Sequence, residues 1–367
     1  MNQAHAPAQA DVVVIGGGPA GLAAAIAARQ AGLDVVLADR ATPPIDKACG
    51  EGLMPDGVDA LRRLGIALPP GIGAPFRGIR FVDGQRMAQA GFAQGSGRGL
   101  RRPDLHRLLA DRAEALGVRC CWGRHVEPAG EHAALIDGQK LHYRFLVGAD
   151  GLNSRLRRDA GIAASWRGER RVGLRQHFRV ALWTDLVEVY WQSGRQAYVT
   201  PVAADEVCVA IIATHGNFSF DDLPSLFPDL ARRLHHARAI DAPRGAISQS
   251  VKWRRVTRGA MSLVGDASAS VDAITGEGMA LAFRQALALA EAMARDDLGA
   301  YQAAHRRMAM LPRVMARLLL LMGRHQGLRH HAIDLLSAQP WLFHRLLKLH
   351  VGAASDIETD LLPVAAE

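Results

Sequence analysis

The stretch DVVVIGGGPAGLAAAIAARQAGLDVVLADR, residues Asp11–Arg40, holds the pattern that decides the fold. The valine-rich run at 11–15 predicts a buried strand, because apolar residues follow one another without alternation. An alanine-rich run at 22–31 predicts a helix that ends at Gly32, and the run at 34–38 predicts a second strand. Strand, glycine turn, helix and strand in this order predict a Rossmann-like α/β unit near the start of the chain.

The turn before the helix carries the G-x-G-x-x-G spacing of dinucleotide-binding sites. Gly16 permits the tight turn, Gly18 lets the backbone approach a diphosphate, and Gly21 lets the helix pack closely on the strand. Asp39 follows the second strand, where a carboxylate accepts hydrogen bonds from an adenosine ribose. The residues predicted to contact the dinucleotide here are Gly16, Gly18, Pro19, Ala20, Gly21, Asp39 and Arg40. This segment leaves open whether the dinucleotide is NAD or FAD.

The composition is that of a globular protein with a basic surface. Of the 367 residues, 49 % are hydrophobic and 22 % are charged, so a core of ordinary size can be buried. The formal net charge of +8 suits an anionic cofactor, an anionic membrane surface or an acidic partner protein. Aromatic residues make up only 5 %, and no Lys/Arg run is interleaved with them, so we predict no binding to nucleic acid.

The cysteines and the start of the chain indicate a reduced, cytoplasmic protein. The four cysteines form no C-x-x-C pair, so the sequence indicates neither a zinc site nor a disulfide framework, and no metal is predicted. The first ten residues lack the basic and apolar regions of a signal peptide. The longest aliphatic run, at 316–323, is too short to span a bilayer.

Two later segments also contain a strand that ends in glycine and is followed by an acid. They lie at Tyr143–Arg158 and Arg258–Ala294. In the second segment, two further glycines open a long alanine-rich helix, whose N-terminus can face an anion or an electron-rich ring. The residues predicted to contact the coenzyme in these segments are Asp150, Gly265, Asp266, Gly276 and Gly278.

Together the three segments resemble the FAD-binding flavoproteins of the glutathione-reductase type. They are most similar to the branch that holds class A aromatic monooxygenases, geranylgeranyl reductases and flavin halogenases. The resemblance implies that the first segment binds the ADP part of FAD and that Asp266 contacts the ribityl region. It also implies that Arg102, in GLRRPDLHRLLADRAEALGV, contacts FAD, with Arg101 as the alternative. Many of the monooxygenases carry prolines behind the third segment, where this chain has Val-Asp-Ala at 271–273.

The fold class implied by this resemblance is α/β. It combines a Rossmann-like FAD-binding domain with an inserted antiparallel β-sheet that binds substrate and a C-terminal helical region. The inserted parts show the alternating patterns, aromatic residues and glycine turns of antiparallel strands. We expect the FAD-binding domain at 1–75, 98–165 and 255–300, the substrate-binding sheet at 76–97 and 166–254, and the helical region at 301–367. Glycines and prolines predict helices in the last part at 298–323, 327–337 and 339–351.

The candidate reactive residues come from DKACGEGLMPDGVDALRRLGI, residues 46–66. Its glycines allow the backbone to lie beside a flat ring. CGEGL resembles the segment that passes near the isoalloxazine in geranylgeranyl-reductase-like proteins, whereas GLMP…LRRLG resembles the matching segment of the monooxygenases. Cys49 and Glu51 are therefore the candidate catalytic residues, Glu51 as a proton relay, with inert packing as the alternative for a lone cysteine. No histidine or carboxylate pair has a spacing that marks an acid–base couple.

The candidate wall of a substrate pocket is VEVYWQSGRQAYVTPVAADEVCVAIIAT, residues 187–214, which predicts a pair of hairpins. In the family this sheet covers the flavin, and AYVTPV aligns with a W-x-F-P stretch of the reductases that faces the ring. The alternative for strand aromatics is plain sheet core. The candidate substrate residues are Val189, Trp191, Tyr198 and Pro201.

We expect an FAD-dependent oxidoreductase, first a monooxygenase that acts on a hydrophobic lipid- or polyketide-like small molecule in secondary metabolism. The match at 53–65 favours oxygenation. The Cys-Gly-Glu-Gly turn favours the alternative, a geranylgeranyl-reductase-like enzyme that reduces carbon–carbon double bonds. A further alternative is a non-catalytic flavin-binding interaction protein. NAD(P)H is a candidate reductant, since monooxygenases of the family use it without a second dinucleotide motif.

The stretch PWLFHRLLKLHVG, residues 340–352, places basic residues among apolar ones. It predicts either a helix packed over the core with a solvated basic face, or an interfacial helix that faces anionic lipid. A third reading is contact with an acyl-carrier protein, because such a partner is acidic. The sequence therefore predicts a peripheral contact with a membrane or a carrier protein as an option for this helix.

Overall fold

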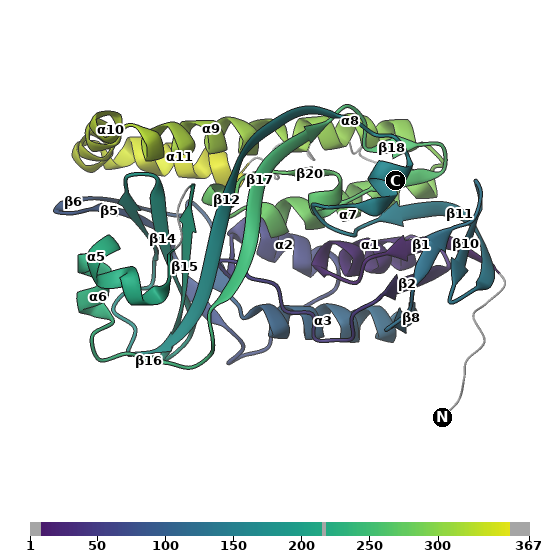
Figure 1. Ribbon diagram of the computed structural model, residues 1–367, viewed down its shortest axis with the longest axis horizontal. Coiled ribbons are helices and arrows are strands. Elements are labelled where there is room, and N and C mark those ends of the chain that lie inside the picture. The colour runs from purple at the N-terminus through teal and green to yellow at the C-terminus, as the bar shows by residue number, and fades with distance from the viewer. Residues whose placement is uncertain (1–8, 215–217, 353–367) are drawn as a thin grey trace, which may run out of the picture.

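The computed structural model describes residues 9–214 and 218–352. An eight-stranded sheet lies beside a nine-stranded sheet, and the C-terminal helices form a row along one side (Figure 1). The predicted α/β fold, a Rossmann-like unit with an antiparallel sheet and a helical end, is confirmed. The last part of the predicted helical region, 353–367, lies outside the described residues.

The eight-stranded sheet has the first strand of the chain near its centre. β1 (Gln9–Ile15) lies between β11 (Gln139–Gly148) and β2 (Val35–Asp39) and is parallel to both. β19 (Met261–Leu263) lies beyond β11 and is parallel to it. β1 and β2 contain nearly continuous apolar runs because most of their side chains are buried on both faces, whereas the first half of β11 alternates between exposed polar and buried residues. The sheet also contains β8 (Arg119–Trp122), β9 (Val126–Pro128), β10 (Ala133–Ile136) and β18 (Thr257–Arg258).

Three strands of this sheet lead into the glycine-containing turns. Because β1, β11 and β19 are adjacent and parallel, their carboxyl ends meet at one edge of the sheet. Gly16, Asp150 and Gly265 follow these ends. Segments far apart in the sequence therefore lie side by side, at the edge where open α/β sheets bind their ligands.

The nine-stranded sheet is antiparallel except where β13 (Val187–Gln192) pairs in parallel with β5 (Gly78–Asp83). That pair joins strands from the two inserted stretches of the chain into one sheet. Its longest strands, β12 (Ala164–Arg179) and β17 (Arg244–Trp253), run side by side (Figure 1). The other members are β6 (Arg86–Gly91), β14 (Arg195–Ala203), β15 (Glu206–Ala213), β16 (Arg238–Ala239) and β20 (Ala269–Ser270). A third, small sheet consists of β3 (Gly52–Leu53), β4 (Ala74–Phe76) and β7 (Gly97–Gly99).

Helix α1 (Pro19–Gln30) packs against α7 (Gly278–Ala294), although the two are far apart in the sequence. Both are rich in alanine, so their backbones can approach closely. Gly21 is buried at the contact between α1 and the turn after β1. The other helices are α2 (Pro55–Arg63), α3 (Arg102–Ala115), α4 (Arg155–Asp159), α5 (Leu223–Leu226) and α6 (Pro228–Arg233).

The C-terminal row consists of α8 (Leu298–Met308), α9 (Met310–Arg324), α10 (Gln326–Ala338) and α11 (Pro340–Gly352). The prediction of one helix at 298–323 is wrong, because the chain divides it at Ala309. Pro312 then lies in the first turn of α9, where its missing amide hydrogen costs no helical bond. Throughout the part of the chain that the structure describes, no helix combines the length and apolar character needed to cross a membrane.

An added methyl group at Gly21 is expected to disturb the contact between α1 and the turn after β1. The Cβ of an alanine there would lie 1.8 Å from the carbonyl oxygen of Gly16, so the two segments would have to separate. We expect Gly21→Ala to lower the free energy of unfolding by about 3 kcal/mol, measured by urea denaturation.

The matched control is Gly327→Ala on α10. A Cβ at Gly327 would meet no atom within 4 Å, so this change is expected to leave stability unchanged or to raise it by about 0.5 kcal/mol. Equal unfolding curves for the two variants would contradict the close packing at Gly21.

Candidate functional site

A cavity of about 1080 Å³ extends from the turns after β1, β11 and β19 to apolar side chains of α9, α10 and α11. Small-molecule sites usually measure about 300–1,000 Å³, so this cavity is large enough for an extended ligand. It brings together most of the residues predicted from the sequence. Those that line it are Gly16, Gly18, Pro19, Ala20, Asp39, Arg40, Cys49, Glu51, Arg102, Asp150, Val189, Tyr198, Gly265, Asp266, Gly276 and Gly278.

Three of the predicted residues do not line the cavity. Gly21 lies behind the turn, where it allows α1 to pack on Gly16. Trp191 packs its ring edge-on against Phe81, with a centroid distance of 5.5 Å, in the core below α10 and α11. Pro201 faces β7, and its carbonyl oxygen lies where a side chain at Gly99 would be.

The turn after β1 is held in shape by Asp39. Its Oδ2 accepts a hydrogen bond from the amide of Gly17 at 2.6 Å, and its Oδ1 accepts one from the amide of Ala41 at 2.7 Å. The carboxylate thus ties the end of β2 to the glycine turn. Its remaining lone pairs can accept hydrogen bonds from a ribose.

Arg102 supplies a positive charge to the cavity. Within the described residues no carboxylate pairs with it, its Nε is buried without a partner, and its Nη1 meets only the sulfur of Met279, at 3.9 Å. A guanidinium in this state suits an anionic ligand such as a diphosphate. The neighbouring Arg101 differs, since it pairs with Glu206 and Asp241.

Several glycines expose their backbone to open space in the cavity. A Cβ added at Gly18, Gly50 or Gly278 would meet no atom within 4 Å. A diphosphate can therefore approach the turn after β1, and a flat ring can approach the backbone near Gly50 and the start of α7. Together with Arg102 and Asp39, these open faces fit the phosphates, ribose and ring of FAD.

The two later acids have different surroundings. Asp150 accepts hydrogen bonds from the amides of Arg155 and Leu156 with Oδ2, which stabilises the start of α4, and its Oδ1 is buried without a partner. Asp266 forms an ion pair with Lys47 at 3.3 Å, and both side chains are partly exposed. Lys47 thereby brings the 46–52 turn to the third glycine segment across the cavity.

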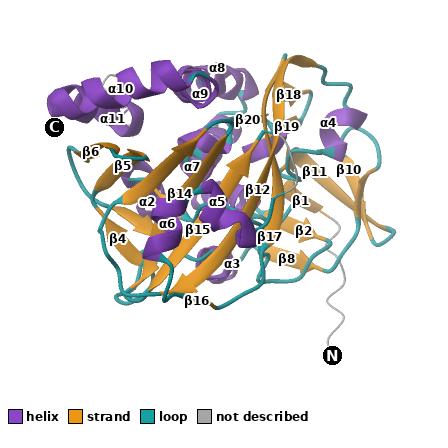
Figure 2. Ribbon diagram, turned by 60° about the vertical axis from the view of Figure 1, so that its left-hand side comes forward, coloured by secondary structure: helices purple, strands orange, loops and turns teal. Residues whose placement is uncertain are grey.

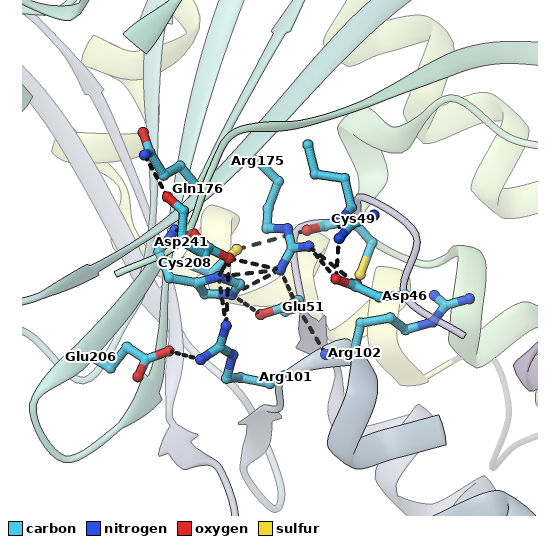
Figure 3. A network of polar contacts seen from close by, with 12 residues as sticks. Asp46, Cys49, Glu51, Arg101, Arg102, Arg175, Gln176, Glu206, Cys208 and Asp241 are labelled. Carbon is cyan, nitrogen blue, oxygen red and sulfur yellow. Dashed lines mark hydrogen bonds and ion pairs between the residues drawn. The ribbon is translucent and has the colours of Figure 1, made fainter. Parts of the chain in front are cut away.

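Glu51 belongs to a buried network that the sequence analysis did not identify (Figure 3). Its Oε2 lies 2.6 Å from Nε2 of His177, and Oε1 accepts hydrogen bonds from the amide of Arg102 and from Nη1 of Arg175. On its other side, His177 Nδ1 lies 2.7 Å from Oδ2 of Asp241. His177 and Asp241 thus form an acid–base chain with Glu51, although no short spacing in the sequence connects them.

The network determines the charge of His177. Burial disfavours the imidazolium, but the hydrogen bonds and charges of Glu51 and Asp241 outweigh burial and raise the pKa of His177. The same interactions outweigh burial at Asp241 and lower the pKa of its carboxyl. The chain therefore runs from Glu51 at the cavity, through the imidazole of His177, to Asp241, whose side chain is 27 % exposed.

Cys49 lines the cavity next to this network. Burial raises the pKa of its thiol, so at neutral pH it stays protonated. The buried Cys208 donates from Sγ to the carbonyl oxygen of Cys49 at 3.7 Å. Glu51, His177 and Cys208 are close enough to form a metal site. Arg175 already occupies the carboxylate, and burial raises the pKa of Cys208 well above its usual value, so this donor set does not suit a cation.

A second buried cluster joins α11 to the start of α7. His350 donates from Nε2 to the carbonyl oxygen of Thr275 at 3.2 Å, and its Nδ1 faces Oε2 of Glu277 at 3.5 Å. Burial raises the pKa of Glu277 to about 8 and lowers that of His350 to about 4. A protonated Glu277 therefore faces a neutral His350, and the hydrogen bond from His350 to Thr275 attaches the last helix beside the cavity.

Comparison with known proteins agrees with this geometry. Residues 9–300 match the family described as FAD binding domain. Over 327 residues the chain is 28 % identical to the menaquinone reductase of Mycolicibacterium smegmatis. This alignment covers 81 % of this chain and 79 % of that protein. It is 25 % identical over 320 residues to the aurachin C monooxygenase/isomerase of Stigmatella aurantiaca, covering 78 % and 81 %. The solved structure of the flavin-dependent brominase Bmp2 has the same fold, with a TM-score of 0.80 over 94 % of each chain at 19 % identity.

The family match spans both the turns that meet at the sheet edge and the strands that complete the cavity. The description of this family names FAD, the ligand that Asp39, Arg102 and the glycines with open space beside their backbone fit. The chain therefore belongs to the FAD binding domain family, and it is an FAD-dependent oxidoreductase, as the sequence predicted.

Proposed function

We propose that this oxidoreductase is a monooxygenase that acts on a hydrophobic, lipid- or polyketide-like small molecule in secondary metabolism. The observation that carries the proposal is the continuity of the cavity: one end is lined by the glycine turns and the other by residues such as Leu319, Leu342 and Leu346. An apolar compound at the far end would share the cavity with the coenzyme. The match to the aurachin C monooxygenase/isomerase along most of both chains supports oxygenation.

The residues of the chain would bind and orient, while bound FAD would supply the redox chemistry. Arg102 and the amides of the turn after β1 would hold the diphosphate. Asp39 would accept hydrogen bonds from the ribose, and the C-terminal helices would exclude water from the apolar end. We also propose NAD(P)H as the reductant, by analogy with the monooxygenases that the sequence resembles.

The same cavity suggests which part of the chain binds the substrate and which part binds FAD. Val189 on β13 and Tyr198 on β14 line it, and the Tyr198 hydroxyl donates to the carbonyl oxygen of Ile274. We therefore propose that 76–97 and 166–254 bind the substrate. The FAD-binding part would comprise 1–75, 98–165 and 255–300, followed by the helices from 301 onward.

Reduction of a carbon–carbon double bond is the second candidate reaction. The Cys-Gly-Glu-Gly turn lines the cavity through Cys49 and Glu51, and the relative from M. smegmatis is named a menaquinone reductase. Such a reduction adds a hydride to one carbon and a proton to the other. A buried thiol at Cys49 would help to position the double bond.

Either reaction needs a route for protons, and the chain of Glu51, His177 and Asp241 supports one. Its two short contacts measure 2.6 and 2.7 Å and connect the cavity to a partly exposed carboxylate. We propose that this chain exchanges protons between solvent and the cavity, with Glu51 as its inner end.

We further propose a peripheral contact of the C-terminal helices with a membrane or with an acyl-carrier protein. The helix predicted as interfacial, α11, buries Phe343, Leu347 and His350, so most of its apolar face packs inward. The surface that supports a membrane contact belongs to α9 and α10.

Removal of the Arg102 guanidinium is expected to weaken FAD binding, because no carboxylate among the described residues competes for it. We expect Arg102→Ala to raise the Kd for FAD at least about tenfold, equivalent to about 1.4 kcal/mol, in fluorescence titrations of the apoprotein. The control is Arg107→Ala on the same helix, an exposed residue paired with Asp104, which should leave the Kd unchanged. Equal affinities for both variants would contradict the role of Arg102.

The reaction type is expected to show in the product formed with isotopically labelled O₂. The holoprotein is incubated with NADPH and either a long-chain alkylphenol or menaquinone, and the products are analysed by mass spectrometry. One labelled oxygen atom in the alkylphenol supports oxygenation. Two hydrogen atoms added to the isoprenoid chain of menaquinone under anaerobic conditions, located by fragmentation so that reduction of the quinone ring to the quinol is not counted, would identify the reductase instead. An FAD that NADPH does not bleach would exclude this reductant.

Replacement of His177 is expected to destabilise the protein most at low pH. Its pKa is raised above the unfolded value of about 6.5, so its contribution to stability is fully present below about pH 6.5 and is lost as the pH rises through the folded pKa. Urea denaturation should therefore show a larger loss for His177→Gln near about pH 6 than near about pH 9. The exposed His236→Gln serves as control, and a loss that grows with pH would contradict a raised pKa of His177.

A further inference from the structure

The exposed large apolar side chains are concentrated on the last three helices. Among the described residues, twelve such side chains are at least two-fifths exposed, and eight of them lie on α9, α10 and α11. On α9 they recur every three or four residues and so form one stripe along the helix. The eight are Met310, Val314, Leu318, Leu321, Leu328, Leu335, Trp341 and Leu349.

The same helices are basic. Residues 310–352 contain six lysines and arginines and one acid, Asp334, which leaves a formal charge of +5, against +8 for the whole chain, and Arg306 and Arg307 at the end of α8 add two positive charges beside them. Asp334 pairs with Arg86 on β6. Five exposed cations have no carboxylate partner within the described part of the chain: Arg306, Arg307, Arg317, Arg345 and Lys348.

Four of the exposed leucines also line the cavity. Leu318 and Leu321 on α9, and Leu328 and Leu335 on α10, line the cavity and are also 43–52 % exposed. The C-terminal helices stand at one side of the molecule, beyond β5 and β6, in both views (Figures 1 and 2). A molecule that enters between α9 and α10 would therefore pass along leucines from the surface to the apolar end.

We propose that α9 and α10 dock on an anionic lipid bilayer and that a lipid-like substrate enters the cavity between them. This inference rests on the proposed hydrophobic substrate, and it adds the partner and the entry route. The stripe would enter the acyl-chain boundary while the cations contact acidic headgroups. α9 has 15 residues and is about 22 Å long, shorter than the hydrocarbon core of about 30 Å. It would therefore lie in the membrane surface.

A bilayer explains the two observations together better than an acidic protein does. Cations alone would attract either partner. A leucine-lined opening that continues into the cavity suits a compound dissolved in acyl chains, which never has to enter water. The end of the sequence is itself acidic, with Asp356, Glu358, Asp360 and Glu367. The experiment must therefore distinguish binding of the cations to lipid from binding of the cations to this acidic segment.

The test is co-sedimentation of the full-length holoprotein with vesicles of phosphatidylcholine alone or mixed with an equal amount of phosphatidylglycerol. We expect binding to the mixed vesicles, weaker binding at high salt, and little binding to phosphatidylcholine alone. The variant Met310→Glu/Val314→Glu changes the stripe at two exposed residues that do not line the cavity. It should lower the bound fraction at least about tenfold, because charged groups resist transfer into the acyl region.

The control variant is Val172→Glu, an equally exposed apolar residue on β12, which should bind as the wild type does. Both variants should keep their FAD spectrum and their bleaching by NADPH, so loss of docking is distinguished from failure of the proposed function. No binding to the mixed vesicles, or equal binding of the stripe variant, would overturn the inference. It would also be overturned if binding appeared only after Asp356→Asn/Glu358→Gln/Asp360→Asn, or only to an acyl-carrier protein.

Discussion

The parallel alignment of β1, β11 and β19 is the constraint on which the rest of the structure depends. Parallel neighbours end at the same edge of a sheet, so the three turns that follow them must share one space. The close contact of Gly21 with Gly16 lets α1 pack against that edge, and Gly16 and Gly18 of the turn line the cavity. Arg102 and the start of α7 line the same cavity as the turns at this edge, so they can contact the same ligand.

The buried charges connect that edge to the antiparallel sheet. Glu51 has a positive φ of 57°, a conformation that costs a non-glycine residue about 1 kcal/mol, and its carboxylate receives the amide of Arg102, Arg175 and His177. Replacing Arg175 or His177 would remove one of these three partners from a buried polar network. The 46–52 turn is thus held in place by charge from both sheets, which places Cys49 and Glu51 at the cavity.

The apolar end of the cavity is closed by helices that come last in the chain. His350 fixes α11 to the backbone of Thr275, directly before the glycines that open α7. The end of the cavity lined by the glycine turns and its apolar end therefore meet where residues 275–278 contact α11. α9 and α10 carry leucines that line the cavity and are also partly exposed, which is the basis of the proposed membrane docking.

The sequence by itself determined the Rossmann-like unit, the antiparallel sheet and the glycine turns that line the cavity, because periodicity and turn chemistry act between residues close along the chain. It also identified Arg102 and Glu51, but only through resemblance. It could not identify His177 and Asp241, since the pairing of strands far apart in sequence brings them to Glu51. Nor could it show that Trp191 and Pro201 lie outside the cavity, or that the exposed apolar stripe belongs to α9 instead of α11. Only the tertiary structure decided these points, because the direction of a side chain depends on the elements packed around it.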